Sequence, residues 1–209
     1  MAFAKKLFSG ITENTPKNIQ LDAGAFFKNF QVGTDTYATA KEAGKCLGAT
    51  QGGGTATIKA TYRQIDVDGA LGRVKGLTDI DTWEVSISAT LLETTVETLK
   101  LALGAAKTTV GSASGDVPEK YTMIQGKTGI DDADYIENIT WVGAISGTGE
   151  PIIIQVFNAL NEDGLSYAVA KQSEGKIGVT FYGYNDLNDF ETDTVEPPFA
   201  IYVPDTATA

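Results

Sequence analysis

The sequence predicts a mainly β fold: a β-sandwich or partial barrel of antiparallel sheets with one packed α-helix. Several segments alternate between apolar and polar residues, and only one shows apolar residues at helical spacing. The 209 residues, 42% hydrophobic and 21% charged, suffice for one substantial core. We expect an N-terminal arm over 1–24, a single domain over 25–190 and an acidic C-terminal arm over 191–209.

The N-terminal arm differs from the start of the core in the periodicity of its apolar residues. Residues 1–24 have none and contain Thr-Glu-Asn-Thr-Pro-Lys-Asn, which is typical of an extended segment. The core is expected to begin at Ala25–Phe30, followed by a short helix between Thr36 and Leu47 that Gly48 ends. The only cysteine, Cys46, can form no intrachain disulfide and is expected to be a small buried hydrophobe.

A long hairpin is predicted over residues 55–75. The glycines 52–54 are interpreted as a flexible strand entrance, because neither a lysine-serine ending nor a helix follows them as in a phosphate-binding loop. Apolar residues occupy even positions from Ala56 to Tyr62 and odd positions at Ile65 and Val67, which predicts a bulge or bend near Arg63–Gln64. Asp68-Gly69 indicates the turn, and Arg73–Lys75 the return.

The next segment combines the clearest strand with the helix. Residues 83–90 alternate strictly, with Trp83 on the apolar side. Thr90-Leu-Leu-Glu93 matches a capping box, and Gly104 supplies a stop, so a helix is predicted over about 91–103. The apolar stripe expected to pack consists of Leu92, Val96, Leu99 and Leu103.

The second half is expected to form a loop and then strands. Residues 107–134 are rich in Gly, Ser, Thr and Asp, which predicts a loop. A turn at Asn161–Gly164 is expected to join the apolar segment 151–157 to a partner strand beginning at Leu165. The expected strands lie at 139–145, 151–157, 165–169, 177–181 and 199–203.

Enzymatic chemistry is not expected, and no cofactor or metal is predicted. The chain has no histidine, which excludes Ser-His-Asp and Cys-His catalysis and most transition-metal sites. Gly126-Lys-Thr128 resembles the end of a phosphate-binding loop, but Tyr121 stands where that loop needs its first glycine. Two alternatives remain open, a glycosidase pair that includes Glu84 and calcium binding by acidic turns. These turns are Asp66/Asp68, Asp79/Asp81 and Asp131/Asp132/Asp134.

The net charge of −11 is unevenly distributed. Residues 1–110 hold 12 basic and 11 acidic residues, whereas residues 111–209 hold 4 and 16. Because phosphate affinity comes from Lys and Arg, tight nucleic-acid binding is not expected. No apolar run is long enough for a membrane span or the centre of a signal peptide, so the chain is expected to stay in the cytoplasm where it is made.

A carbohydrate-binding β-sandwich is a different class of function that the aromatic residues allow. Trp83, Trp141, Tyr182 and Tyr184 could stack on sugars. Both tryptophans fall on the apolar faces of expected strands, however, which favours core packing.

The remaining features point to assembly. Arms and an overlong hairpin present unpaired backbone edges that neighbouring copies would pair. The unlike charges of the two halves suit a head-to-tail contact, which closes into rings or propagates as a filament. The hairpin residues expected at contacts between subunits are Thr55, Thr57, Lys59, Thr61, Arg63, Asp66, Asp68, Arg73 and Lys75.

Four segments resemble the major tail tube proteins of long-tailed bacteriophages that infect Gram-positive hosts. They are Leu21-Asp-Ala-Gly-Ala-Phe-Phe-Lys-Asn-Phe, Leu47-Gly-Ala-Thr-Gln-Gly-Gly-Gly, Asp66-Val-Asp-Gly-Ala-Leu-Gly-Arg-Val-Lys-Gly and Ile87-Ser-Ala-Thr-Leu-Leu-Glu. With the later segments Ile153–Leu160 and Gly178–Tyr184, the similarity extends over roughly residues 9–190.

This resemblance implies a subunit of hexameric rings whose inner sheets join into a continuous barrel for viral DNA. It implies a virion location after assembly in the bacterial cytoplasm, with tape measure and tail-terminator or distal-tail proteins as partners. DNA would pass without sequence-specific binding. The near alternative is the inner tube of a contractile tail or of a phage-derived injection device. We do not expect the immunoglobulin-like domain that some relatives append.

Overall fold

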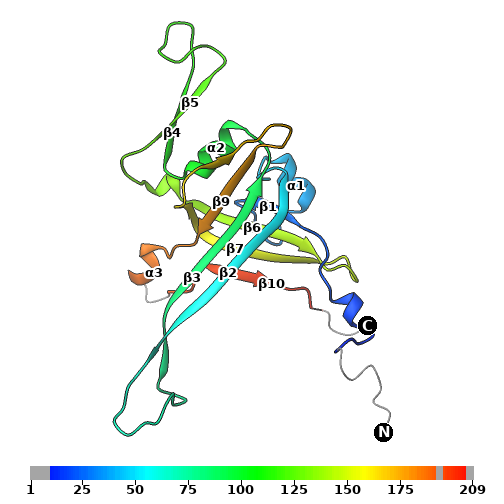
Figure 1. Ribbon diagram of the computed structural model, residues 1–209, viewed down its shortest axis with the longest axis vertical. Helices are drawn as coiled ribbons and strands as arrows, with labels where there is room; N and C mark the ends of the chain where they lie inside the picture. Colours follow the sequence, from blue (N-terminus) through cyan, green and yellow to red (C-terminus); the bar gives the residue numbers. More distant parts are fainter. Residues whose placement is uncertain (1–9, 192–194, 206–209) are drawn as a thin grey trace.

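The computed structural model describes residues 10–191 and 195–205 and confirms a mainly β fold of antiparallel sheets. The main sheet has the strand order β1-β6-β7-β9-β3-β2, with β10 added beside β7 and β8 beside β9 (Figure 1). The strands are β1 (Ala25–Lys28), β2 (Thr50–Gln64), β3 (Thr78–Leu91), β4 (Ala106–Val110), β5 (Thr122–Gly126), β6 (Ile136–Ala144), β7 (Pro151–Asn161), β8 (Ser166–Ala168), β9 (Lys176–Tyr182) and β10 (Phe199–Tyr202). The helices are α1 (Tyr37–Glu42), α2 (Val96–Leu103) and α3 (Leu187–Glu191), with 3-10 turns at Thr15–Lys17 and Asp132–Asp134.

Strand β7 joins the two layers of the sandwich. One edge of β7 pairs with β6, while its other edge pairs first with β10 and then, at Leu160 and Asn161, with β9. Between these partners Asn158 has a positive φ of 45°, a conformation that asparagine tolerates better than most residues. The first layer therefore contains β1, β6, β7 and β10, and the second contains β2, β3, β9 and β8.

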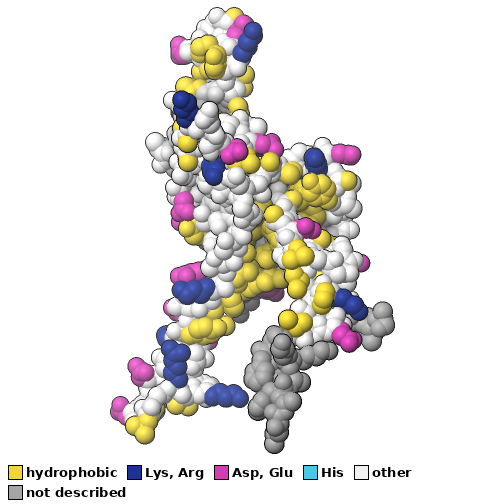
Figure 2. Space-filling view, turned by 45° about the vertical axis from the view of Figure 1, so that its right-hand side comes forward, with side chains coloured by type: hydrophobic (Ala, Val, Ile, Leu, Met, Phe, Trp, Pro, Cys, Tyr) yellow, Lys and Arg dark blue, Asp and Glu magenta, His cyan; other side chains and the backbone are white. Residues whose placement is uncertain are grey.

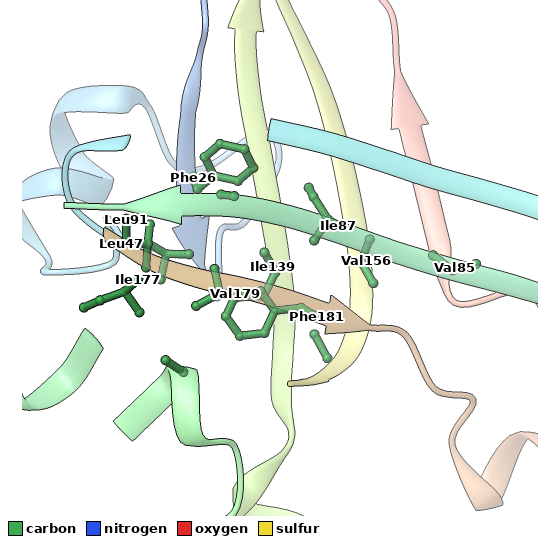
Figure 3. Packing of buried hydrophobic residues seen from close by; sticks show 13 residues of the cluster. Phe26, Leu47, Val85, Ile87, Leu91, Ile139, Val156, Ile177, Val179 and Phe181 are labelled. Atoms are coloured by element: carbon green, nitrogen blue, oxygen red, sulfur yellow. The ribbon is translucent and has the colours of Figure 1, made fainter. Parts of the chain in front are cut away.

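The main core lies between these layers (Figure 3). Its buried residues are Phe26, Leu47, Val85, Ile87, Ala89, Leu91, Ala102, Ile139, Val156, Ala159, Ile177, Val179 and Phe181. A smaller cluster on the other side of β1 includes Phe27, Phe30 and Ala40 of α1. Cys46 packs against that smaller cluster as a small hydrophobe, but it is half-buried and not buried as expected.

The predicted start of the main helix is wrong. Leu91 belongs to β3 and is fully buried, and α2 begins only after Thr95, whose hydroxyl accepts a hydrogen bond from the Thr98 N–H. The Glu93 carboxylate instead accepts a hydrogen bond from the Ala49 N–H. The helix ends before Gly104, as expected. Of the predicted stripe, Leu99 packs against the main core, whereas Val96 is exposed; the fully buried residues of the helix are Thr98 and Ala102.

The predicted return of the long hairpin is also wrong. β2 pairs with β3, from Thr50 opposite Leu91 to Gln64 opposite Thr78, so the hairpin spans residues 50–91 and its connecting loop is 65–77. The bulge expected near Arg63–Gln64 is not there, since these residues pair regularly with Asp79 and Thr78; a bulge occurs instead at Asp81 of β3, because Thr61 lies opposite Thr82 and Tyr62 opposite Ile80. Ile65 and Val67 lie beyond the end of β2, in the connecting loop. The switch of apolar residues from even to odd positions therefore marks the end of the strand.

The segment 107–134 is not simply a loop. β4 and β5 form a separate two-stranded sheet that projects from the end of the molecule opposite the long hairpin (Figure 1). The sequence gives little indication of these two strands. Each has five residues, and most of their side chains are exposed, so no alternation of apolar and polar residues marks them.

Both terminal segments make contacts with the sandwich. The Trp141 Nε1–H donates to the Ala23 carbonyl at 2.9 Å, and Gln20 forms a β-bridge with Ile145. At the other end β10 pairs with β7, so part of the expected C-terminal arm belongs to the sheet. β8 pairs with β9 and not with β7, which corrects the expected partner of the strand after Leu165. The remaining parts of the expected arms, residues 1–9, 192–194 and 206–209, lie outside the described residues.

Candidate assembly surface

The outer edge of β2 is the most prominent candidate interaction surface. β2 pairs with β3 on one side, and among the described residues no strand pairs with its other side. A 15-residue strand with one unpaired edge presents N–H and C=O groups that another chain can pair. Short strands, bulges or covering loops usually protect such an edge in a monomer.

One face of this hairpin is polar, with small side chains. Along β2 and β3 the facing pairs are Thr55/Ser88, Thr57/Ser86, Lys59/Glu84 and Thr61/Thr82, and β9 continues the face with Thr180 opposite Ser88. The Lys59 ammonium lies 3.3 Å from the Glu84 carboxylate, and both side chains are exposed. An exposed pair of this kind contributes little to stability, but it neutralises the basic group on this face.

The opposite face of the hairpin is apolar and continues beyond the sandwich. Near the body, Ile58 and Trp83 pack against the core, and the Trp83 ring centroid lies 5.3 Å from that of Phe199. Further out, Tyr62 and Ile80 face each other because of the bulge at Asp81, and they are 64% and 47% exposed. Figure 2 shows hydrophobic side chains running from the body toward this hairpin.

The connecting loop 65–77 carries further exposed apolar side chains, namely Ile65, Val67, Leu71 and Val74. Clusters of exposed apolar residues on a soluble protein usually mark a contact surface.

The residues predicted for subunit contacts fall into two groups. Thr55, Thr57, Lys59 and Thr61 lie on the polar face of β2, and Arg63 follows opposite Asp79. Asp66, Asp68, Arg73 and Lys75 lie in the connecting loop and not in a strand. Sequence reasoning missed the apolar residues of the loop, although their exposure follows from their position beyond the sandwich.

The glycine cluster forms an irregularity inside β2 and not an entrance before it. Thr50 lies opposite Leu91 and Gly54 opposite Ala89, so three residues of β2 face one residue of β3. Gly52 and Gly53 have φ values of 79° and 72°, which glycine adopts without strain. Gly54 contacts the Phe26 ring and the Ser88 carbonyl so closely that no side chain fits.

A shallow depression of about 390 Å³ lies beside these glycines on the polar face. Most of its lining residues are small and uncharged, such as Gly52, Ser88 and Thr180, but the lining also includes Asp163. The Asp163 carboxylate accepts a hydrogen bond from the Tyr182 hydroxyl at 3.2 Å.

The acidic group at 131–134 serves a structural purpose. Lys127, directly after β5, lies 3.0 Å from the Asp131 carboxylate and 2.7 Å from that of Asp134. A hydrogen bond from the Asp131 N–H, assisted by Lys127, lowers the pKa of Asp134, and the hydrogen bonds to Asp134 and Asp131 raise the pKa of Lys127. Among the described residues no group of three or more His, Cys, Asp or Glu side chains is arranged to hold a metal ion.

The Lys127–Asp134 pair is expected to fix the base of the β4–β5 hairpin. Because the pKa of Asp134 is lowered, its contribution is present above the ordinary aspartate pKa, near 4, and is lost as the pH falls through the lowered value. We predict that Asp134→Asn speeds hydrogen exchange of the β4 and β5 amides at neutral pH. Asp132→Asn, at an exposed neighbour, is the matched control, and equal exchange in both variants would contradict the assignment.

The four aromatic residues considered for sugar stacking have partners within the chain. Trp83 and Trp141 pack against the main core. The Tyr182 hydroxyl donates to the Asp163 carboxylate at 3.2 Å, and the Tyr184 and Tyr135 ring centroids lie 5.2 Å apart in an edge-to-face contact. This arrangement favours packing roles over a carbohydrate platform.

No described helix has the length and apolar character required to cross a membrane. No protein-family model matches the chain, and no curated protein is significantly similar to it.

Proposed function

We propose that the chain is a structural subunit of a phage tail tube, which assembles into stacked hexameric rings that conduct viral DNA. The observation that best supports this proposal is the β2–β3 hairpin, which extends beyond the sandwich and leaves the β2 edge unpaired. The ring number and the identity of the assembly are what the sequence resemblance to tail tube proteins implies.

Pairing between subunits would use the edge of β2. A neighbouring copy that pairs with this edge extends the β9-β3-β2 sheet, and repetition around a ring closes the sheets into a barrel without edges. The apolar side of the sheet, with Ile58 and Val85, already faces the sandwich core. The polar side, with Thr57 and Ser86, would therefore face the lumen.

Such a lumen is suited to passage and not to binding. Affinity for the DNA backbone comes from unneutralised Lys and Arg, and on this face Lys59 is paired with Glu84. The net charge of −11 adds a general repulsion for phosphates. No enzymatic step, cofactor or metal is part of the proposal.

The proposed partners are further copies of the chain, the tape measure protein inside the tube, and the terminator and distal-tail proteins at its ends. The location is the virion tail. The inner tube of a contractile tail or injection device would use the same surface, and a sheath gene beside this one would distinguish that alternative.

Sedimentation velocity over a range of concentrations tests whether the chain assembles. We expect species much larger than the 22.1 kDa monomer at high concentration. Because charged surfaces contribute, the assembled fraction should change between about 0.05 and 1 M salt, over which the screening length falls several-fold. A chain that stays monomeric at every concentration and salt contradicts the proposal.

A further inference from the structure

The β4–β5 hairpin is a second projecting element that the proposed ring contacts do not use. It extends from the end of the molecule opposite the long hairpin (Figure 1). Within the described chain, β4 and β5 pair only with each other. A two-stranded hairpin is marginally stable alone in water, so this one needs reinforcement or a partner.

The tip of this hairpin is locally well organised. The Gly111 N–H donates to the Tyr121 carbonyl at 2.8 Å, the Ser112 N–H donates to the Val117 carbonyl at 3.1 Å, and the Val117 side chain is buried within the turn. Gly111 lies so close to the Pro118 carbonyl that no larger residue fits. With the Lys127–Asp134 pair at its base, the hairpin is held at both ends, which is expected of an element with a fixed docking direction.

The tip of the hairpin carries exposed apolar side chains and two acidic residues. Val110 and Tyr121, beside the tip, are 77% and 68% exposed. Residues 111–119 include Asp116 and Glu119 and no basic residue, although Lys120 follows. Figure 2 shows hydrophobic side chains near the end of this hairpin.

The loop at the opposite end of the molecule has the complementary character. Its return half, residues 69–77, includes Arg73 and Lys75 and no acidic residue, whereas Asp66 and Asp68 lie in the other half of the loop. Leu71 and Val74, within the same stretch, are exposed and apolar. Each end thus combines exposed apolar side chains with a local group of like charges, acidic at Asp116 and Glu119 and basic at Arg73 and Lys75, although neither whole element carries a net charge.

We infer that the β4–β5 tip of one copy docks against the loop 69–77 of the next copy along the assembly axis. The two surfaces lie at opposite ends of the chain, so a contact between them is head-to-tail and propagates. Val110 and Tyr121 would pack on Leu71 and Val74. This inference rests on the proposed self-assembly and assigns the axial contact, whereas the edge of β2 makes the lateral one.

Charge reversal tests the inference in the full-length chain. Asp116→Lys with Glu119→Lys, or Arg73→Glu with Lys75→Glu, places like charges together and should raise the concentration for half-maximal assembly by about tenfold or more. All four substitutions in one chain restore opposite charges and should restore assembly. Tyr121→Asp tests the apolar part separately and should also impair assembly. Glu42→Lys with Glu174→Lys, two exposed positions outside both surfaces and outside the arms, is the matched control and should assemble as wild type.

The outcomes separate this inference from the proposed function, provided that circular dichroism shows each variant to be folded. Tubes that form normally in both reversed variants overturn the axial contact and leave the tube proposal intact. A combined variant that stays impaired also overturns the contact. If linear filaments without a hollow centre form, and if they are lost in the reversed variants and restored in the combined variant, the axial contact is supported and the proposed tube is contradicted. A wild-type chain that never associates overturns both.

Discussion

Shortening the long hairpin is expected to abolish assembly while leaving a folded monomer. Thr61 and Thr82 face each other directly, so replacing residues 62–81 with Asn-Gly closes the shortened strands by a two-residue turn. The core residues Val85, Ile87 and Leu91 lie on the retained part of β3. The melting temperature should therefore stay close to that of the wild type, while electron microscopy should show neither rings nor tubes.

An equivalent change elsewhere provides the control. Ala168 and Lys176 also face each other, so Asn-Gly can replace the exposed loop 169–175 in the same way. This variant should assemble normally. Intact tubes from the shortened long hairpin would show that the protruding part is not an assembly element.

Gly54→Ala is expected to produce the largest loss of stability among single changes in the glycine cluster. A Cβ atom at this position would overlap the Phe26 ring and the Ser88 carbonyl, both fixed in the sandwich. Overpacking of this kind costs about 1–3 kcal/mol in the free energy of unfolding. For a chain of this length, the melting temperature should fall by about 2–12 °C.

Gly126→Ala is the matched control for that substitution. Gly126 also lies in a strand, its φ is not positive, and no atom lies within 4 Å of the added Cβ. Its melting temperature should change little. If Gly54→Ala were as stable as Gly126→Ala, the close packing of β2 on Phe26 would be wrong.

Most of the core could be predicted from the sequence because burial follows alternation. Ile177, Val179 and Phe181 alternate along β9 and are all buried as expected. The helix start could not be predicted in the same way. Thr90-Leu-Leu-Glu93 matches a capping pattern, but Leu91 is buried in the main core as part of β3, and this tertiary contact outweighs the local preference.

The pairing of the long hairpin shows a second limit of local patterns. Asp68-Gly69 favours a tight turn, yet the actual connection is 13 residues long, over 65–77, and is closed by the Ile65 N–H donating to the Leu77 carbonyl. The strand that returns is the one with the strongest alternation, β3. The bulge at Asp81 shifts the alternation of β3 by one residue and so places Trp83 and Ile80 on the same face. This shift can be recognised in the sequence only once β2 is known to be the strand that pairs with β3.

The candidate assembly surface depends on the order of the strands in the sheet, which local sequence patterns do not give. The polarity of Thr55, Thr57 and Thr61 is evident from the alternation. That β2 lies at an edge depends on the strand order of the whole sheet, including the pairing of β9 with β3. The β4–β5 hairpin was missed because its exposed strands have no buried face to produce a pattern.

Electron microscopy of the purified, concentrated protein is the decisive test of the proposed tube. We expect rings with six-fold symmetry that stack into hollow tubes, with the polar face of β2 and β3 toward the lumen. Particles that remain the size of a single 22.1 kDa chain at every concentration and salt, together with no incorporation into phage tails, would contradict it.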